Sequence, residues 1–431
     1  MRATGLPASQ AASGGEPIRV ALDARLVSGD RGGVEQVIIG LADGLSRLTE
    51  SPDEYLFLVD PANRDWLTPF LSGPCRTIDS EVRPAAQKST PRRSVLRRAA
   101  GKVARMVGFS RVRRPELGPA DPALERHRVD LMHFTMQVGF RTGLPSMFMP
   151  QDLQHVHLPE FFTRQALAER DAIYRGLSEQ ATVVVANSRF GKRDLEESFG
   201  LPPSKVAIVP YAPVIDAYHD PAPADLAETR SELSLPDAFA LYPAKAWPHK
   251  NHRRLLEALA ILRREGLILP VVFTGAQNGF DDGVLRSATE LGVADLIRFA
   301  GFVTPIRLAS MYRLARFMVF PSLFEGWGMP VLEAFAVGLP VTCSNATCLP
   351  DLAAGAALVF DPRRPEDIAA NMRSLWQDEA LRRDLVARGQ ARARSFTWER
   401  TARLLRAHYR VMASRNLTDQ DRALLAAEPL V

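Results

Sequence analysis

Short apolar runs alternate along this chain with longer segments in which apolar residues recur every three or four positions. The short runs are typical of buried parallel strands, and the longer segments are typical of helices that pack one face on a core. A Gly-rich turn, SGDRGG, separates the first predicted strand from a helix over 34–48. In the first half we expect strands at 18–26, 54–60, 129–135, 146–153, 181–188 and 204–213.

The same alternation restarts after a polar, Pro/Ala-rich segment near residue 214. We expect strands at 238–244, 269–275, 296–302, 316–322 and 339–345. Helices are expected at 251–266, 281–292, 305–315, 330–338, 365–396 and 397–414. Strands alternating with helices in this way form parallel sheets with right-handed crossovers. The predicted fold class is therefore α/β, with two doubly wound, Rossmann-like domains.

A chain of 431 residues is too long for one ordinary core, which agrees with two domains. The predicted parts are a disordered tail, a first domain that holds a basic insertion, a linker with some helix, a second domain, and a terminal helix that crosses back to the first domain. Their ranges are 1–16, 17–215 with the insertion 83–115, 216–236, 237–395 and 396–431.

The cysteine content and the apolar runs predict a cytoplasmic protein. Three cysteines make no disulfide framework, and we expect Cys343 and Cys348 to be buried. No apolar run reaches about 18 residues, so no membrane span is expected. The first residues contain no apolar core of a secretory signal, so none is expected there.

The stretch FPSLFEGWGMPVLEAFAVGLPV, residues 320–341, places Glu325 and Glu333 in an otherwise apolar run. Glu325 falls in the loop after a predicted strand, and Glu333 is expected in the first turn of the next helix. Gly326 and Gly328 allow backbone amides to approach a ligand. Free amides at a helix start favour an anion, and carboxylates accept from sugar hydroxyls. This combination suits a sugar nucleotide. The alternative is a solvated loop Glu and a second Glu that only complements the helix dipole.

This stretch resembles the E-x7-E motif of retaining GT-B glycosyltransferases of family 4, the group 1 family. YPAKAWPHKNHRRLLEALAIL, IRFAGFV, LPD at 349–351 and SFTWERTARLL follow in the same order as in that family. The resemblance implies the GT-B fold, in which two Rossmann-like domains face a central cleft. It also implies that Glu333 holds the ribose and that Glu325 contacts the donor sugar. The amides around Trp327, Gly328 and Met329 would meet sugar hydroxyls and the diphosphate.

Two basic positions and one glycine loop complete the expected donor site. The resemblance puts Lys245 and Lys250 of PAKAWPHKN on the pyrophosphate, with two solvated lysines as the alternative. SGDRGGVEQ, residues 28–36, resembles the family's amino-terminal glycine loop, in which Gly32 and Gly33 let the backbone approach the donor phosphate or the acceptor. These expectations give the donor-binding set Gly33, Lys245, Lys250, Glu325, Gly326, Trp327, Gly328, Met329 and Glu333.

The catalytic set expected from the resemblance is Glu325, Lys250, Asp152 and Gln151. MPQDLQHVHLPEFF, residues 149–162, resembles a segment that usually carries a His-Asp pair, and here Gln151 replaces the His. Gln donates hydrogen bonds but moves no protons. Asp419 and Asp421 match a DxD metal motif by letters only and lie in what reads as a polar tail. We therefore expect neither a metal nor a cofactor other than the nucleotide diphosphate sugar donor.

Residues 83–115 contain no acidic residue and many arginines. The net charge of the chain is only +5, so the positive charge is concentrated here. Residues 92–114 could form a basic amphipathic helix that attaches to an anionic membrane surface, on the inner face. A solvated insertion is the alternative. No aromatic platform favours nucleic-acid binding.

The function predicted from these features is that of a retaining, metal-independent hexosyltransferase. It would move mannose or glucose from a nucleotide diphosphate sugar to a glycan or lipid-linked acceptor in polysaccharide biosynthesis. We expect Glu333→Ala to weaken nucleotide binding and Lys250→Ala to lower turnover. The alternatives are a catalytically weak GT-B scaffold subunit and a nucleotide-sugar epimerase. A dinucleotide oxidoreductase is disfavoured, because DARLVSGDRGG is not a G-x-G-x-x-G turn.

Overall fold

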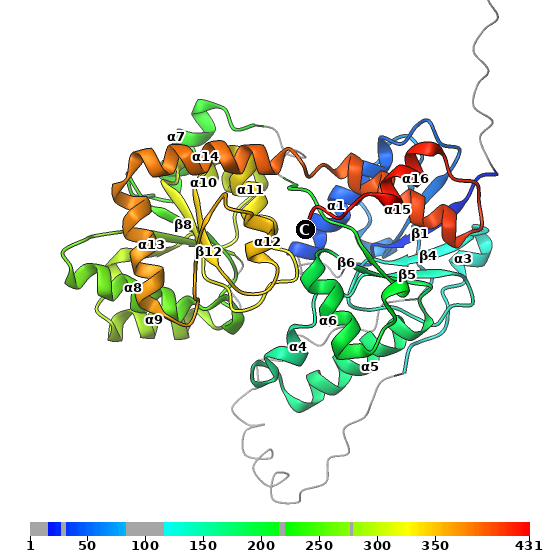
Figure 1. The fold of residues 1–431 in the computed structure, drawn as a ribbon, viewed down its shortest axis with the longest axis horizontal. Coiled ribbons are helices and arrows are strands. Elements are labelled where there is room, and N and C mark those ends of the chain that lie inside the picture. The colour runs from blue at the N-terminus through cyan, green and yellow to red at the C-terminus, as the bar shows by residue number, and fades with distance from the viewer. Residues whose placement is uncertain (1–15, 27–31, 83–115, 215–219, 276–278) are drawn as a thin grey trace, which may run out of the picture.

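The computed structural model describes residues 16–26, 32–82, 116–214, 220–275 and 279–431. Its strands form two separate sheets, each in its own lobe (Figure 1). Residues 1–15 of the predicted tail, residues 28–31 of the Gly-rich loop 28–36 and the whole basic insertion 83–115 lie outside the described residues.

The first lobe is built on a seven-stranded sheet in the order β3-β2-β1-β4-β5-β6-β7. Every pair of neighbouring strands in it is parallel. The strands are β1 Arg19–Asp23, β2 Glu54–Val59, β3 Cys75–Asp79, β4 Leu131–Phe134, β5 Ser146–Phe148, β6 Val183–Ala186 and β7 Val206–Ile208. The helices of this lobe are α1 Gly33–Ser46, α3 Ala123–Arg126, α4 Gln154–His157, α5 Arg164–Gln180 and α6 Arg189–Phe199.

The second lobe has a six-stranded parallel sheet in the order β10-β9-β8-β11-β12-β13. Its strands are β8 Ala240–Pro243, β9 Val271–Thr274, β10 Ile297–Phe299, β11 Phe317–Phe320, β12 Val341–Ser344 and β13 Leu358–Phe360. Its helices are α8 His252–Arg264, α9 Asp281–Glu290, α10 Pro305–Leu314, α11 Met329–Val337, α12 Leu349–Ala353, α13 Pro365–Gln377 and α14 Glu379–Ala393.

These two sheets confirm the predicted α/β class with two doubly wound sheets. Some elements differ from the prediction. The helix predicted over 365–396 is two helices, because Asp378 leaves the helical conformation and its side chain accepts a hydrogen bond from the Leu381 amide as the N-cap of α14. Residues 216–236, predicted as a linker with some helix, do contain one, α7 Pro223–Glu232, which packs against α10. The exact domain boundaries stay a prediction.

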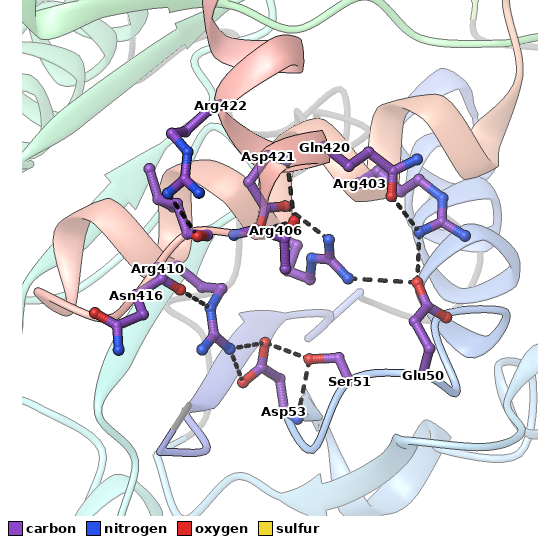
Figure 2. A network of polar contacts seen from close by, with 12 residues as sticks. Glu50, Ser51, Asp53, Arg403, Arg406, Arg410, Asn416, Gln420, Asp421 and Arg422 are labelled. Atoms are coloured by element: carbon purple, nitrogen blue, oxygen red, sulfur yellow. Dashed lines mark hydrogen bonds and ion pairs between the residues drawn. The ribbon is translucent and has the colours of Figure 1, made fainter. Parts of the chain in front are cut away.

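The last helices, α15 Trp398–Met412 and α16 Asp419–Ala426, lie on the first lobe. The Trp398 ring packs directly on α1, where a Cβ on Gly40 would come within 1.9 Å of it. Arg410 forms a buried ion pair of 2.7 Å with Asp53, which precedes β2 (Figure 2). Removing one partner of such a pair costs about 3–5 kcal/mol. These contacts fix α15 on the first lobe. Because α15 follows α14 of the second lobe directly in the chain, they also tie the two lobes together.

The expectation that Asp419 and Asp421 lie in a polar tail is wrong. Both begin α16, and Asp421 is fully buried. Its carboxylate accepts from Arg406 at 2.7 Å and from the Thr418 amide in a capping box (Figure 2). The two aspartates that match a metal motif therefore lie in the first turn of a helix, where Asp421 pairs with Arg406.

Candidate functional site

The loop between β11 and α11 carries Glu325 to the junction of the two lobes. β11 is fully buried, and the chain leaves the carboxyl end of this strand, where doubly wound sheets bind ligands. Glu325 Oε1 lies 2.6 Å from the Lys250 ammonium, and both side chains are largely buried. The Glu325 amide donates to Thr347 Oγ1 at 3.3 Å. Two of the predicted catalytic residues are thus in direct contact.

Gly326 and Gly328 shape this loop for two different reasons. A Cβ on Gly326 would lie 2.0 Å from the Gln151 carbonyl oxygen, so glycine is required for the loop to touch the first lobe. Gly328 has φ +98° and is the N-cap of α11. Only glycine adopts such a conformation without strain. The neighbouring Trp327 side chain is buried against Tyr211 and Phe396, and its carbonyl accepts a hydrogen bond from Cys348 Sγ at 3.0 Å.

Glu333 lies in the second turn of α11, not in the first turn as predicted. The helix begins at Met329 rather than at Pro330, which makes Glu333 its fifth residue. The carboxylate accepts a hydrogen bond from Tyr312 Oη at 2.8 Å. Burial raises the pKa of Glu333 to about 6, and the Tyr312 hydrogen bond opposes this rise.

Asp152 and Gln151 approach the same loop from the first lobe, on the segment that follows β5. Burial raises the pKa of Asp152, and the nearby Arg170 charge opposes this rise. A Cβ on Gly326 would lie 3.0 Å from the Asp152 Cβ, so Asp152 packs against the loop that carries Glu325. Gln151 has φ +70°, which is uncommon for a side-chain-bearing residue and clusters at functional sites. Its side-chain amide donates to the Thr135 carbonyl and accepts from Tyr211 Oη. The Gln151 side chain is therefore engaged within the first lobe.

Gly32 and Lys245 face each other between the two lobes. A Cβ built on Gly32, the N-cap of α1, would lie 3.8 Å from Lys245 Nζ, whereas nothing lies within 4 Å of such an atom on Gly33. The start of a helix favours an anion, and the Lys245 ammonium lies beside the start of α1. These two elements could together bind a phosphate.

The predicted residues thus come from the four loops that follow β1, β5, β8 and β11 and from the helices α1 and α11 that two of these loops enter. The structure brings together Glu325, Lys250, Asp152 and Gly326, and it separately pairs Gly32 with Lys245. A small pocket lies between the lobes, lined by residues of 150–153 and 185–195 and by Phe324 and Gly326. A larger cavity of about 170 Å³ lies elsewhere, between Ile208, α15 and α16.

The sequence reasoning missed several contributors to this site. Tyr312 and Thr347 hold the two glutamates, and His157 and Asp194 lie beside Phe324. Each is distant in the sequence from the group it contacts, so periodicity carries no signal for them. Thr347 has φ +57°, which a single sequence does not reveal.

Two absences concern only the residues that the structure describes. No group of three His, Cys, Asp or Glu side chains is placed to hold a metal ion there. No helix in the described ranges has the length and apolarity needed to cross a bilayer.

Comparison with known proteins identifies the family of this chain. The family model "Glycosyl transferases group 1" matches residues 227–392. A D-inositol 3-phosphate glycosyltransferase of Kineococcus radiotolerans is 32% identical over 311 residues, which cover 64% of this chain and 70% of that protein. The chain belongs to the group 1 glycosyltransferase family. O-antigen chain mannosyltransferase B of Escherichia coli is 32% identical over 251 residues, 58% of this chain and 65% of that protein.

The chain spans less than two thirds of the length of O-antigen chain mannosyltransferase B. It spans only 24% of an Escherichia coli serotype-specific mannosyltransferase WbdA. Among solved structures, Anabaena Alr3699/HepE in complex with UDP and glucose has a TM-score of 0.66 at 18% identity and covers 91% of this chain and 100% of its own. Sucrose-phosphate synthase of Thermosynechococcus elongatus has a TM-score of 0.67 at 18% identity, with 92% and 99% covered. These likenesses confirm the predicted GT-B fold.

Proposed function

We propose that the protein is a retaining glycosyltransferase. It transfers a hexose from a nucleotide diphosphate sugar to a hydroxyl of a glycan or lipid-linked acceptor. The observation that carries this proposal is the Lys250–Glu325 pair of the second lobe, on a loop that packs at Gly326 against Asp152 of the first lobe. Family membership supports the class of reaction. The mannosyltransferase names of several relatives favour mannose as the hexose.

The residues suit a reaction in which the diphosphate leaves with growing negative charge. Lys245 and the start of α1 would hold the diphosphate, and a preorganised positive charge stabilises the leaving group. Lys250 keeps Glu325 at a fixed place, where its carboxylate would stabilise positive charge on the reacting carbon. The leaving phosphate would accept the acceptor proton on the same face, which retains the configuration. No metal and no further cofactor is part of this proposal.

The two glutamates have separate roles in this proposal. Glu333, buried beneath Tyr312, would accept from the ribose hydroxyls, and Glu325 would act at the sugar. Asp152 would contact the donor sugar or the acceptor from the first lobe. Gln151 would place the Asp152 backbone rather than act on the substrate, because its amide is engaged with Thr135 and Tyr211.

Thermal unfolding with GDP, UDP and ADP tests this donor site. A ligand at about a hundred times its dissociation constant stabilises the folded state by about 2.7 kcal/mol. One diphosphate should raise the unfolding temperature of the wild type and raise it less in Glu333→Gln, a variant that keeps the side-chain volume. A shift with none of the three would contradict the donor site. Binding without transfer from any matching donor would identify the scaffold alternative.

We further propose that the protein is cytoplasmic and attaches to the inner face of the membrane through residues 92–114. The proposal is supported by the composition of that segment alone, since it lies outside the described residues. Cosedimentation with vesicles that contain phosphatidylglycerol tests it, with phosphatidylcholine vesicles as control. Replacing Arg97 and Arg98 by Gln should lower binding to the anionic vesicles only, and equal binding to both kinds would contradict it.

A further inference from the structure

The residue just before Glu325 is held by the opposite lobe. The Phe324 ring is buried, with 5% of its surface exposed. Its ring stacks on His157 of α4, with centroids 5.1 Å apart and planes at 23°. It also meets the edge of Phe190 of α6 at 6.0 Å. The loop that carries Glu325 therefore buries its leading side chain in the first lobe.

His157 is itself fixed by a buried carboxylate. Its Nε2 lies 2.7 Å from Asp194 Oδ1, in a geometry in which Nε2–H donates to the carboxylate. The Ser198 hydroxyl donates to the same oxygen at 2.9 Å. Asp194 is 7% exposed, whereas the His157 side chain is 40% exposed. A buried carboxylate is costly unless it is hydrogen-bonded, so Asp194 selects one orientation of the imidazole ring.

Glu325 lies between two contacts that join the lobes. On one side Phe324 packs on His157, and on the other Gly326 meets the Gln151 carbonyl so closely that no side chain fits. Both contacts require the present arrangement of the lobes. The placement of the Glu325 carboxylate is therefore linked to how the first lobe lies against this loop.

We propose that His157 and Asp194 are positioning residues for sugar transfer, which hold the Glu325 loop through Phe324. This inference rests on the proposed function and adds residues that neither the motif nor the family match assigns. His157 acts through the ring contact and does not touch the substrate. Its loss should lower turnover more than donor affinity, because Lys245 and Glu333 would hold the nucleotide without it.

The test compares His157→Ala with His157→Phe, which keeps a ring for stacking but loses the hydrogen bond to Asp194. An aromatic pair of this kind changes an equilibrium by about two- to tenfold. His157→Ala should therefore lower kcat by about five- to tenfold, while the Kd of GDP, UDP or ADP changes by less than about twofold. His157→Phe should recover only part of the lost kcat, because it keeps the ring contact but loses the orientation that Asp194 gives to it. His127→Ala, a histidine of the same lobe at the end of α3, is the matched control and should behave as wild type.

Hydrogen exchange supplies a second measurement that does not need activity. Amides of 322–328 should exchange about five- to tenfold faster in His157→Ala, by a smaller factor in Asp194→Ala and in His157→Phe, which keep a ring against Phe324, and no faster in His127→Ala. If Asp194→Ala does not fold, the His157 variants decide. Unchanged exchange and unchanged kcat in His157→Ala would overturn the inference, as would an equal loss in His157→Ala and in His157→Phe.

The proposed function and this inference fail in different ways. If the wild type transfers no sugar, the proposed function fails, and the exchange of 322–328 still decides whether His157 holds the loop. If the wild type transfers sugar and the His157→Ala variant matches it in both measurements, only the inference is overturned.

Discussion

The two ends of the stretch 325–333 place their carboxylates in opposite surroundings. Glu325, on the loop, lies against the Lys250 ammonium, whereas Glu333, on α11, has a neutral phenol as its hydrogen-bond partner. Burial raises the pKa of Glu333 to about 6. Two identical side chains eight residues apart are thus suited to different tasks. In the proposed reaction, the loop glutamate stabilises a charge that develops during transfer, and the helix glutamate accepts hydrogen bonds from ribose hydroxyls.

The largest expected effect comes from removing the cation that distinguishes the surroundings of Glu325 from those of Glu333. Lys250→Ala leaves Glu325 without the ammonium that it contacts and removes a charge near the leaving group. Loss of one such electrostatic contact lowers kcat by about 10²–10³-fold. Steady-state transfer measures the loss. Arg253→Ala is the matched control, because this nearby basic side chain is 75% exposed and pairs only within α8. Equal kcat in both variants would contradict the role of Lys250.

A second change acts on the helix end alone. Glu333→Gln keeps the volume but replaces a charged acceptor by a neutral amide, so the affinity for the nucleoside diphosphate should fall by about tenfold. At saturating donor, kcat should stay within about threefold of the wild type, because uniform binding is lost. Calorimetric titration and steady-state kinetics separate the two effects. A loss confined to kcat would reverse the assignment of the two glutamates.

The raised pKa of Glu333 predicts a pH dependence at this end only. The folded state holds the proton more tightly than the unfolded state, whose value is near 4.5, so ionisation of Glu333 destabilises the fold. Stability is greatest below pH 4.5 as far as this group is concerned, and it falls by about 2 kcal/mol as the pH rises to 6. Above pH 6 the loss is complete. Denaturant unfolding should show this decline in the wild type and not in Glu333→Gln.

Donor binding should respond in the opposite direction to the same titration. A ribose hydroxyl is held best by the carboxylate form, so nucleoside diphosphate affinity should fall as the pH drops below about 6. The phosphates titrate as well, and Glu333→Gln serves as the control for them. An identical pH profile in both proteins would show that Glu333 is not at the ribose.

The smallest expected effect comes from the phenol. Tyr312→Phe removes the hydrogen bond to Glu333 and should raise the pKa of this carboxyl further, because that bond opposes the effect of burial. A single hydrogen bond to a charged group contributes about 1.5–3 kcal/mol to stability. We expect water to replace part of this interaction with the Glu333 carboxylate in the variant. We expect about a threefold loss of nucleotide affinity at neutral pH. An unchanged affinity would mean that Tyr312 supports only the fold.

The sequence predicts both sheets, because strand and helix periods alternate clearly in each half. It missed β3 and β13, each at the edge of its sheet, since CRTID mixes charged and apolar residues and LVF is only three residues long. It placed Glu333 one turn too early, because the residue that begins a helix depends on the cap. Here Gly328, at positive φ, lets α11 start at Met329.

The candidate site was predictable only as far as the loops that follow strands. Lys250 and Glu325 are 75 residues apart, yet the order of strands in a doubly wound sheet brings their loops to one edge. Contacts between the lobes follow no such rule. The stacking of His157 on Phe324 and the close approach of Gly326 to Gln151 depend on how the two sheets lie against each other, which no local pattern encodes.

The most direct test of the central claim is nucleoside diphosphate release from GDP-mannose and UDP-glucose, with and without a glycan acceptor, by the wild type and by Lys250→Ala. The proposed function predicts acceptor-dependent release from one donor, with the anomeric configuration retained in the product and a rate at least about 10²-fold lower in the variant. Acceptor-dependent release at equal rates by both proteins, or an inverted product, would contradict it.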